Sequence, residues 1–193
     1  MAKHIIIYIP GLGDHNLGGQ QKALKLWQIY GVQTEICPMD WLVDEPWSVK
    51  LQRLLDRIDY HSQRGSIVSL VGISAGSTAA LQALEKRRKL IHKAVIICGK
   101  FQYPETVHPL RFVMNPAFKN ALNESVNILR NLTPEDKQKI KSFRAIYDNL
   151  LPSRETQIPG VRSSIMPAIT HVGGIAYALT LGSWRIVRFL KMP

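Results

Sequence analysis

The residues best suited to chemistry lie in one short segment, Gly72-Ile73-Ser74-Ala75-Gly76. An apolar, β-branched run at 67–71 precedes this Gly-x-Ser-x-Gly pattern and an Ala/Leu-rich run follows it. The pattern therefore falls between a predicted strand and a predicted helix, where a sharp turn would lift the Ser74 hydroxyl clear of the sheet as a nucleophile. Such an elbow needs small residues two places before and after the serine, and Gly72 and Gly76 meet that need. The pattern also occurs by chance, but its setting favours a nucleophilic Ser74.

A nucleophilic serine needs a base to take its proton and an acid to orient that base. In a parallel sheet these groups come from loops at the carboxyl ends of strands. Among the six histidines we favour His171, which follows the last predicted strand, over His15, which follows the first. Asp148 follows the fifth predicted strand and is the preferred acid, with Asp40 as the alternative. The chain order Ser74, Asp148, His171 is the order expected for a nucleophile elbow.

Each of these two assignments has a structural alternative. His171 could make only local hydrogen bonds at the start of the helix that follows it. Asp148 could simply close its strand with an Asx turn.

Two backbone N–H groups are needed to stabilise the oxyanion that forms when the serine attacks. Ala75, directly after the nucleophile, supplies one, and Leu12 in the glycine-containing loop 10–14 is expected to supply the other. The same glycines could merely turn the chain from a strand into a helix. A phosphate loop is not favoured, because the loop lacks the third glycine of a dinucleotide site and no Gly-Lys-Ser/Thr follows.

Strand and helix patterns alternate along the chain, which predicts an α/β fold. We expect a mostly parallel sheet of about six strands with helices on both faces, in a single domain spanning 1–193. The predicted strands are 4–9, 32–37, 67–73, 94–98, 142–147 and 160–165. The predicted helices are 20–29, 46–61, 75–88, one starting near 133, and a closing helix at 173–190.

The segment 101–133 breaks this alternation and is expected to be a small cap-like insertion over the strand ends, with one helical piece at 123–132. Its apolar side chains could line an acyl pocket or seal the cap onto the body; they are Phe101, Tyr103, Phe112, Met114 and Phe118. Arg111, in the same segment, is a candidate contact for an acidic substrate.

The chain of 193 residues carries a formal net charge of +11. Its densest basic run, 86–89, ends a predicted helix, where cations suit the helix dipole, so we expect a solvated helix end. Nucleic-acid binding is not favoured, because aromatic residues are not interleaved with that run. Peripheral contact with an anionic surface is left open. Neither Cys37 nor Cys98 has a partner at metal-ligand spacing, and no signal peptide is recognised, so we expect a cytoplasmic protein without a metal site.

Four motifs together resemble those of the α/β-hydrolase superfamily. They are Ile9-Pro10-Gly11-Leu12-Gly13, Gly72-Ile73-Ser74-Ala75-Gly76, Tyr147-Asp148-Asn149-Leu150-Leu151-Pro152 and Thr170-His171-Val172-Gly173-Gly174. The resemblance covers nearly the whole chain and is to a compact member that lacks the first two strands of the full eight-stranded sheet. One departure is Pro10-Gly11, where the superfamily often carries His-Gly.

The resemblance implies a serine hydrolase that works through an acyl-enzyme and needs no cofactor. Ser74 would attack, His171 would act as base and then acid, Asp148 would orient His171, and the N–H groups of Leu12 and Ala75 would hold the oxyanion. The preferred reaction is hydrolysis of a small-molecule carboxylic ester. The alternatives are a thioesterase, an amidase or an acyltransferase with the same residues, and a non-catalytic basic α/β binding domain.

Overall fold

Six parallel strands form one sheet in the computed structural model, which describes residues 2–193. The strands run in the order β2-β1-β3-β4-β5-β6, and every neighbouring pair is parallel. Their bounds are β1 His4–Ile9, β2 Gln33–Ile36, β3 Ile67–Ile73, β4 Ile91–Ile97, β5 Ile140–Ala145 and β6 Arg162–Met166. The predicted fold class is therefore confirmed.

The central strands are apolar along their whole length because both of their faces are covered. In β1, Ile5, Ile7 and Ile9 pack into the core on one face, while Ile6 and Tyr8 pack into the core on the other. All five are buried. Alternate side chains of one strand thus hold two helical layers onto the sheet.

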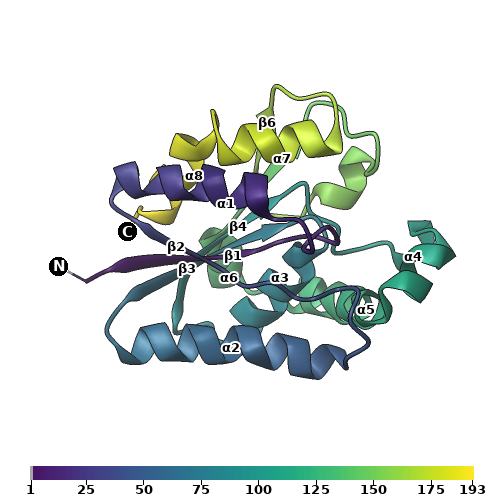
Figure 1. Ribbon diagram of the computed structural model, residues 1–193, viewed down its shortest axis with the longest axis horizontal. Helices are drawn as coiled ribbons and strands as arrows, with labels where there is room; N and C mark the ends of the chain where they lie inside the picture. Colours follow the sequence, from purple (N-terminus) through teal and green to yellow (C-terminus); the bar gives the residue numbers. More distant parts are fainter. Residues whose placement is uncertain (1) are drawn as a thin grey trace.

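Helices cover both faces of the sheet, as Figure 1 shows. One layer holds α2, α3 and α5, whose side chains share a core with one face of β1. The other holds α1, α7 and α8. The bounds are α1 Gly18–Lys25, α2 Trp47–Gln63, α3 Gly76–Lys86, α4 Pro109–Met114, α5 Pro116–Asn131, α6 Pro134–Lys139, α7 His171–Leu179 and α8 Ser183–Leu190, with short 3-10 helices η1 Leu26–Tyr30, η2 Pro104–Thr106 and η3 Ser153–Thr156. No helix within residues 2–193 is long and apolar enough to cross a bilayer.

The predicted closing helix at 173–190 is in fact two helices. α7 ends at Leu179, and the backbone of Thr180 leaves the helical region with a ψ of −95°. The Gly182 N–H then donates to the Tyr177 carbonyl at 2.7 Å and closes the turn into α8. The carbonyl of Leu179 is satisfied by the indole N–H of Trp27 at 2.9 Å, so the break leaves this polar group paired.

The segment 101–133 has two parts with different surroundings. α5 lies in the same layer as α2 and α3, and its Phe118, Ala121 and Leu122 are buried in their common core. The Gln82 side chain of α3 donates to the Ala121 carbonyl at 2.8 Å. In contrast, α4 has no buried residue and lies away from the sheet (Figure 1). The expected helix at 123–132 is thus the second half of a longer helix that covers the sheet.

Candidate active site

Ser74 occupies the turn between β3 and α3 and has a φ of 50°, in the left-handed region that non-glycine residues rarely adopt. The turn is held in place by two backbone hydrogen bonds. The Ser74 N–H donates to the Ile97 carbonyl at 3.0 Å, and the Lys100 N–H donates to the Ser74 carbonyl at 3.1 Å. Such strain persists only where the surrounding structure enforces it, and it occurs most often at functional sites.

The two glycines of the motif are required by close packing. A Cβ on Gly72 would lie 2.8 Å from the Ala80 Cβ in α3, and a Cβ on Gly76 would lie 2.3 Å from the Ile9 carbonyl oxygen of β1. The sequence prediction of small residues here is correct. The space is limited, however, by the helix after the turn and by the neighbouring strand.

The side chains of Ser74, His171 and Asp148 lie together at the carboxyl edge of the sheet. His171 Nδ1 is 2.8 Å from Asp148 Oδ2, and His171 Nε2 is 3.0 Å from Ser74 Oγ. When Nδ1 donates to the carboxylate, Nε2 is left as the acceptor of the serine hydroxyl. His171 is buried, and its backbone N–H donates to Asn149 Oδ1 at 3.0 Å, so both the ring and the backbone of this residue are held in place.

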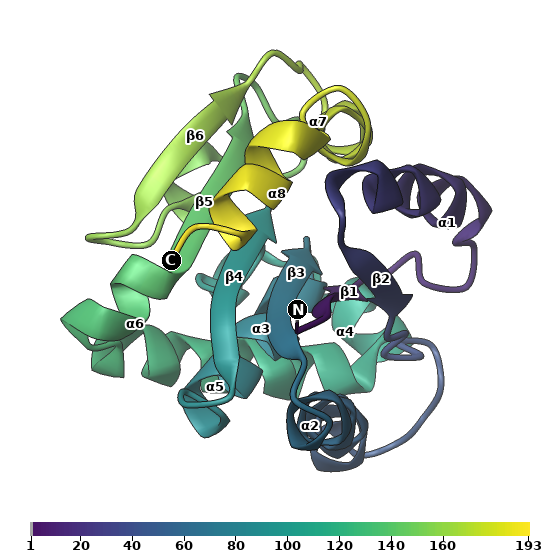
Figure 2. The same cartoon turned by 90° about the vertical axis from the view of Figure 1, so that its left-hand side faces the viewer.

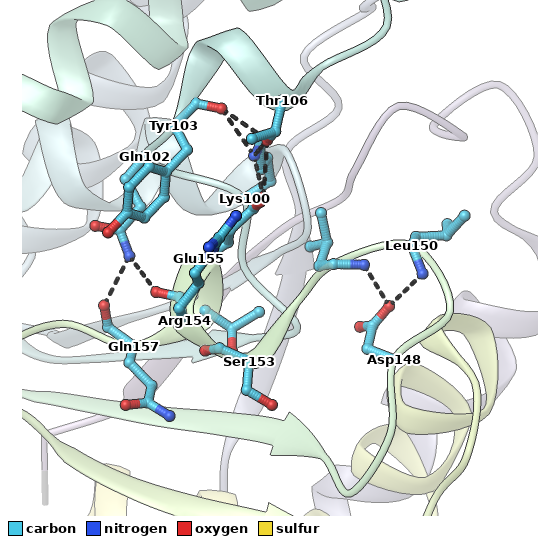
Figure 3. A network of polar contacts seen from close by, with 12 residues as sticks. Lys100, Gln102, Tyr103, Thr106, Asp148, Leu150, Ser153, Arg154, Glu155 and Gln157 are labelled. Atoms are coloured by element: carbon cyan, nitrogen blue, oxygen red, sulfur yellow. Dashed lines mark hydrogen bonds and ion pairs between the residues drawn. The ribbon is translucent and has the colours of Figure 1, made fainter.

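Asp148 uses its two carboxylate oxygens for different contacts. Oδ2 faces His171, while Oδ1 accepts the N–H groups of Leu150 and Leu151, both at 2.9 Å. Figure 3 shows the contact between Asp148 and Leu150. The Asx-type turn weighed as an alternative is therefore present together with the contact to histidine. Burial would raise the pKa of Asp148, but its hydrogen bonds from His171, Leu150 and Leu151 outweigh burial, and the pKa lies below its usual range.

The other candidates for base and acid have different surroundings. Asp40 pairs with Arg53 at 3.2 Å. His15 is exposed and does not line the cavity at Ser74. Asp14, which sequence reasoning did not single out, is buried and accepts the Met39 N–H at 3.0 Å, so it ties the loop after β1 to the loop after β2.

The two proposed oxyanion donors border the nucleophile. Leu12 and Ala75 line the same cavity as Ser74 and His171. Among the backbone hydrogen bonds of turns, loops and caps within residues 2–193, none is donated by the N–H group of Leu12 or Ala75. A Cβ on Gly11 would lie 3.0 Å from the Ser74 Cβ, so a larger residue there would require the loop or Ser74 to shift by a few tenths of an ångström. The Leu12 loop follows β1, and Ala75 follows β3. The direction of the strand order reverses between these two strands. Ligands of open α/β sheets bind at such a point.

The cavity in front of Ser74 has a volume of about 430 Å³. Of the apolar side chains considered for an acyl pocket, Phe118 lines it, while Phe101 is fully buried in the core. Arg111 also lines it, as do Arg154, His108 and the apolar residues Val107, Leu150, Leu151 and Pro152.

A buried ion pair, which sequence reasoning missed, forms part of the cavity wall. Lys100 follows β4 and Glu155 lies in η3, and their side chains are 5% and 2% exposed. Lys100 Nζ contacts Glu155 Oε2 and also donates to Thr106 Oγ1 at 2.7 Å and to the Tyr103 carbonyl at 3.0 Å (Figure 3). No local pattern in the sequence links these residues.

One further group lies behind the histidine. Ligand atoms of Cys98, Asp148 and His171 lie within 4.8 Å of one another, a spacing that a metal ion could bridge. Burial, followed by the charge of Asp148, raises the pKa of the Cys98 thiol to about 12. Cys98 is fully buried in the apolar core on the α7 and α8 side of the sheet, and Asp148 Oδ2 and His171 Nδ1 already face each other at 2.8 Å. A metal ion here would have to displace that hydrogen bond.

Comparisons with known proteins identify the architecture. A structure from work on LipS and LipT, two metagenome-derived lipolytic enzymes, matches 98% of this chain and 94% of its own, with a TM-score of 0.75 and 11% identity. Est1E from Butyrivibrio proteoclasticus matches 97% of this chain and 89% of its own at a TM-score of 0.66 and 15% identity. MGS-MChE2, an alpha/beta hydrolase from a lagoon-sediment metagenome, matches 98% of this chain and 91% of its own, with a TM-score of 0.67 and 16% identity.

No protein-family model and no curated protein sequence matches the chain. At these low identities the structural matches establish the fold. Together with the parallel six-stranded sheet, they show that this chain has the α/β-hydrolase fold.

Proposed function

We propose that this protein is a serine hydrolase that cleaves a carboxylic ester through an acyl-enzyme. The observation that carries the proposal is the hydrogen-bonded series from Ser74 through His171 to Asp148, which begins at a strained turn facing a cavity. Fold likeness to lipolytic enzymes and to Est1E is consistent with it.

In the first half of the reaction, Ser74 Oγ attacks the carbonyl carbon and its proton passes to His171 Nε2. The N–H groups of Leu12 and Ala75 stabilise the oxyanion. The carbon–oxygen bond to the leaving group then breaks, and His171 returns its proton to the departing alkoxide. A water molecule gives a proton to His171 and attacks the acyl carbon. The bond from that carbon to Ser74 Oγ then breaks, His171 returns the proton to Ser74 Oγ, and the carboxylic acid leaves.

The test of the nucleophile is labelling with a fluorophosphonate probe, followed by intact mass and peptide mapping. The wild-type protein should gain one label at Ser74, and Ser74→Ala should gain none. Ser163→Ala, at an exposed position of β6, is the matched control and should label like the wild type. Equal labelling of the Ser74→Ala protein would overturn the proposal.

The orienting role of Asp148 predicts the behaviour of Asp148→Asn. An asparagine amide would donate to His171 Nδ1 and reverse the ring tautomer, so that Nε2 could no longer accept the serine proton. We expect kcat for an aryl ester to fall by about 10³- to 10⁴-fold. An Asp148→Asn enzyme with nearly full kcat would show that the carboxylate does not orient the base.

The same residues could act on thioesters or amides or transfer an acyl group to another acceptor. A panel of esters, thioesters and amides with one common acyl group, with product analysis in the presence of added alcohols, separates these reactions. The ester should have the highest kcat/KM, and the free acid should be the main product.

A further inference from the structure

The cavity in front of Ser74 is lined by four charged side chains besides those of the proposed catalytic residues: Lys100, Arg111, Arg154 and Glu155. Lys100 and Glu155 neutralise one another in the buried ion pair. The three N–H groups of Lys100 are used by Glu155, Thr106 and the Tyr103 carbonyl, so none is left for a ligand. The remaining charge that faces the cavity is that of the two arginines.

Neither arginine is neutralised by the protein. Within residues 2–193, neither Arg111 nor Arg154 forms an ion pair with a carboxylate. Arg111 comes from α4 and Arg154 from η3, so two separate elements each bring a guanidinium group to one cavity. A guanidinium presents a planar fork of N–H donors that matches a carboxylate.

Hydrogen bonds and the buried ion pair hold η3, the segment that carries Arg154, against the loop that follows β4. Gln102 Nε2 donates to the carbonyls of Arg154 and Gln157, both at 2.9 Å, and Glu155 is held by Lys100 (Figure 3). The guanidinium carbon of Arg154 lies 6.0 Å from the centre of the Tyr103 ring. A buried ion pair contributes little net stability, because desolvation offsets the attraction. The ion pair joins η3 to the loop after β4, and its position is better explained by its holding these two segments together.

We propose, given the hydrolase function above, that the substrate is a negatively charged ester, and that Arg111 and Arg154 select it by binding its carboxylate. The two arginines are specificity-determining residues that act on binding, since neither takes part in the hydrogen-bonded series from Ser74 through His171 to Asp148. A charged ester should therefore differ from its neutral counterpart chiefly in KM.

Matched substrate pairs test this inference. One pair places the charge on the acyl part: p-nitrophenyl hydrogen adipate against p-nitrophenyl methyl adipate. The other places it on the alcohol part: 4-(butyryloxy)benzoate against its methyl ester. In at least one pair the charged ester should have a kcat/KM at least tenfold higher, and that preference should shrink between 20 mM and 500 mM NaCl because salt screens exposed charges.

Arginine variants assign the preference to the proposed residues. Arg154→Gln and Arg111→Gln should each reduce the charged-to-neutral ratio of kcat/KM by about tenfold, mainly through KM, as expected on loss of a charge-assisted hydrogen bond. Arg130→Gln, an exposed arginine of α5 outside the cavity, is the matched control and should keep the wild-type ratio. Ratios near one for both pairs, or a ratio that survives both cavity substitutions, would overturn the inference.

A binding measurement separates this inference from the proposed function. Titration calorimetry on Ser74→Ala compares methyl hydrogen adipate with dimethyl adipate and needs no turnover. The charged ligand should bind at least tenfold more tightly, and adding Arg154→Gln should abolish the difference. Equal affinities within this pair, and also between 4-(butyryloxy)benzoate and its methyl ester, would refute the anion site even if esters are hydrolysed. A clear difference together with no labelling of Ser74 in the wild type would refute the hydrolase function alone.

Discussion

Gly76 occupies a position with no room for even one methyl group. A Cβ added there would approach the carbonyl oxygens of Ile9 and Pro10 to 2.3 and 2.5 Å, and both are backbone atoms that cannot move aside cheaply. We expect Gly76→Ala to lower the free energy of unfolding by about 3 kcal/mol, as overpacking of a core does. Gly13→Ala is the control, since a Cβ there meets nothing within 4 Å. Urea unfolding of both variants measures the difference, and equal midpoints would contradict this packing argument.

His4 is a second residue whose surroundings have a measurable consequence. Burial, and then the nearby charges of His92 and Lys191, lower the pKa of His4 from 6.5 to about 4. Its Nε2 lies 2.9 Å from Ser69 Oγ on the neighbouring strand β3. The folded state therefore holds His4 neutral, while the unfolded chain takes up a proton as the pH falls through 6.5.

The sign of the pH effect follows from this difference. Stability contributed by neutral His4 is fully present above about pH 7 and is lost as the pH falls toward 4. We expect the free energy of unfolding to drop by about 2 kcal/mol between pH 7.5 and pH 5 from this residue alone. Urea unfolding at the two pH values should show a smaller drop in His4→Gln than in the wild type. Parallel pH profiles would mean that His4 is not the responsible group.

Among the structural elements, each part of the candidate site follows a different strand of the sheet. The Leu12 loop follows β1, Ser74 follows β3, Lys100 follows β4, Asp148 follows β5 and His171 follows β6. Parallel strands bring all these loops to one edge. The contact between Lys100 and Glu155 then connects the loop after β4 to η3, between β5 and β6.

Loss of the contact between Lys100 and Glu155 should lower the free energy of unfolding. Glu155→Gln removes the charge that compensates buried Lys100, and loss of one partner of a buried pair typically costs about 3–5 kcal/mol. We expect the midpoint of urea unfolding to fall accordingly. Arg53→Gln, which breaks partly exposed pairs with Asp40 and Glu45, should cost about 1 kcal/mol or less. Similar losses in the two variants would show that removal of the Glu155 charge does not leave Lys100 as an uncompensated buried charge.

For the molecule as a whole, the positive charge is unevenly spread. Lys141 of β5 and Arg162 of β6 stand directly opposite one another in the sheet, and Arg185 and Arg188 of α8 add two more cations. α8 lies across this face of the sheet in Figure 2. Burial, and then the charges of Arg185, Arg162 and Arg188, lower the pKa of Lys141. Like charges on neighbouring strands oppose folding.

Relief of this repulsion should stabilise the fold. At 20 mM NaCl we expect Lys141→Gln to raise the free energy of unfolding by up to about 1 kcal/mol. The gain should be smaller at 500 mM NaCl, where the wild-type charges are already screened. Thermal unfolding of both proteins at the two salt concentrations tests this, and a variant less stable than wild type at low salt would refute it.

For the basic run at 86–89, the local sequence predicts the position of the charges but not their partners. Its position at the end of α3 agrees with the sequence, but two of its cations have specific partners. Arg87 pairs with Asp59 of α2 at 2.7 Å, and Arg88 pairs with Asp136 of α6 at 3.0 Å. The sequence places the charges on a helix end, but their partners lie on other elements and depend on how the helices pack.

Local signals determined the alternation of strands and helices, the elbow at Ser74 and the choice of Asp148 and His171. A strand, a turn or a helix start depends mainly on neighbouring residues, and the parallel order of the strands places their ends at one edge. The break between α7 and α8 and the packing of α5 against α3 were not predictable in this way. Both depend on contacts with segments far away in the chain, such as Trp27 and Gln82.

The sequence by itself determined which residues could carry the chemistry, because motif and order specify them. Only the tertiary structure decided which charges surround that chemistry. Lys100 and Glu155 are 55 positions apart, and Arg111 and Arg154 come from separate elements. No spacing in the sequence predicts that these four side chains line one cavity, because their proximity results from the packing of whole elements around the sheet.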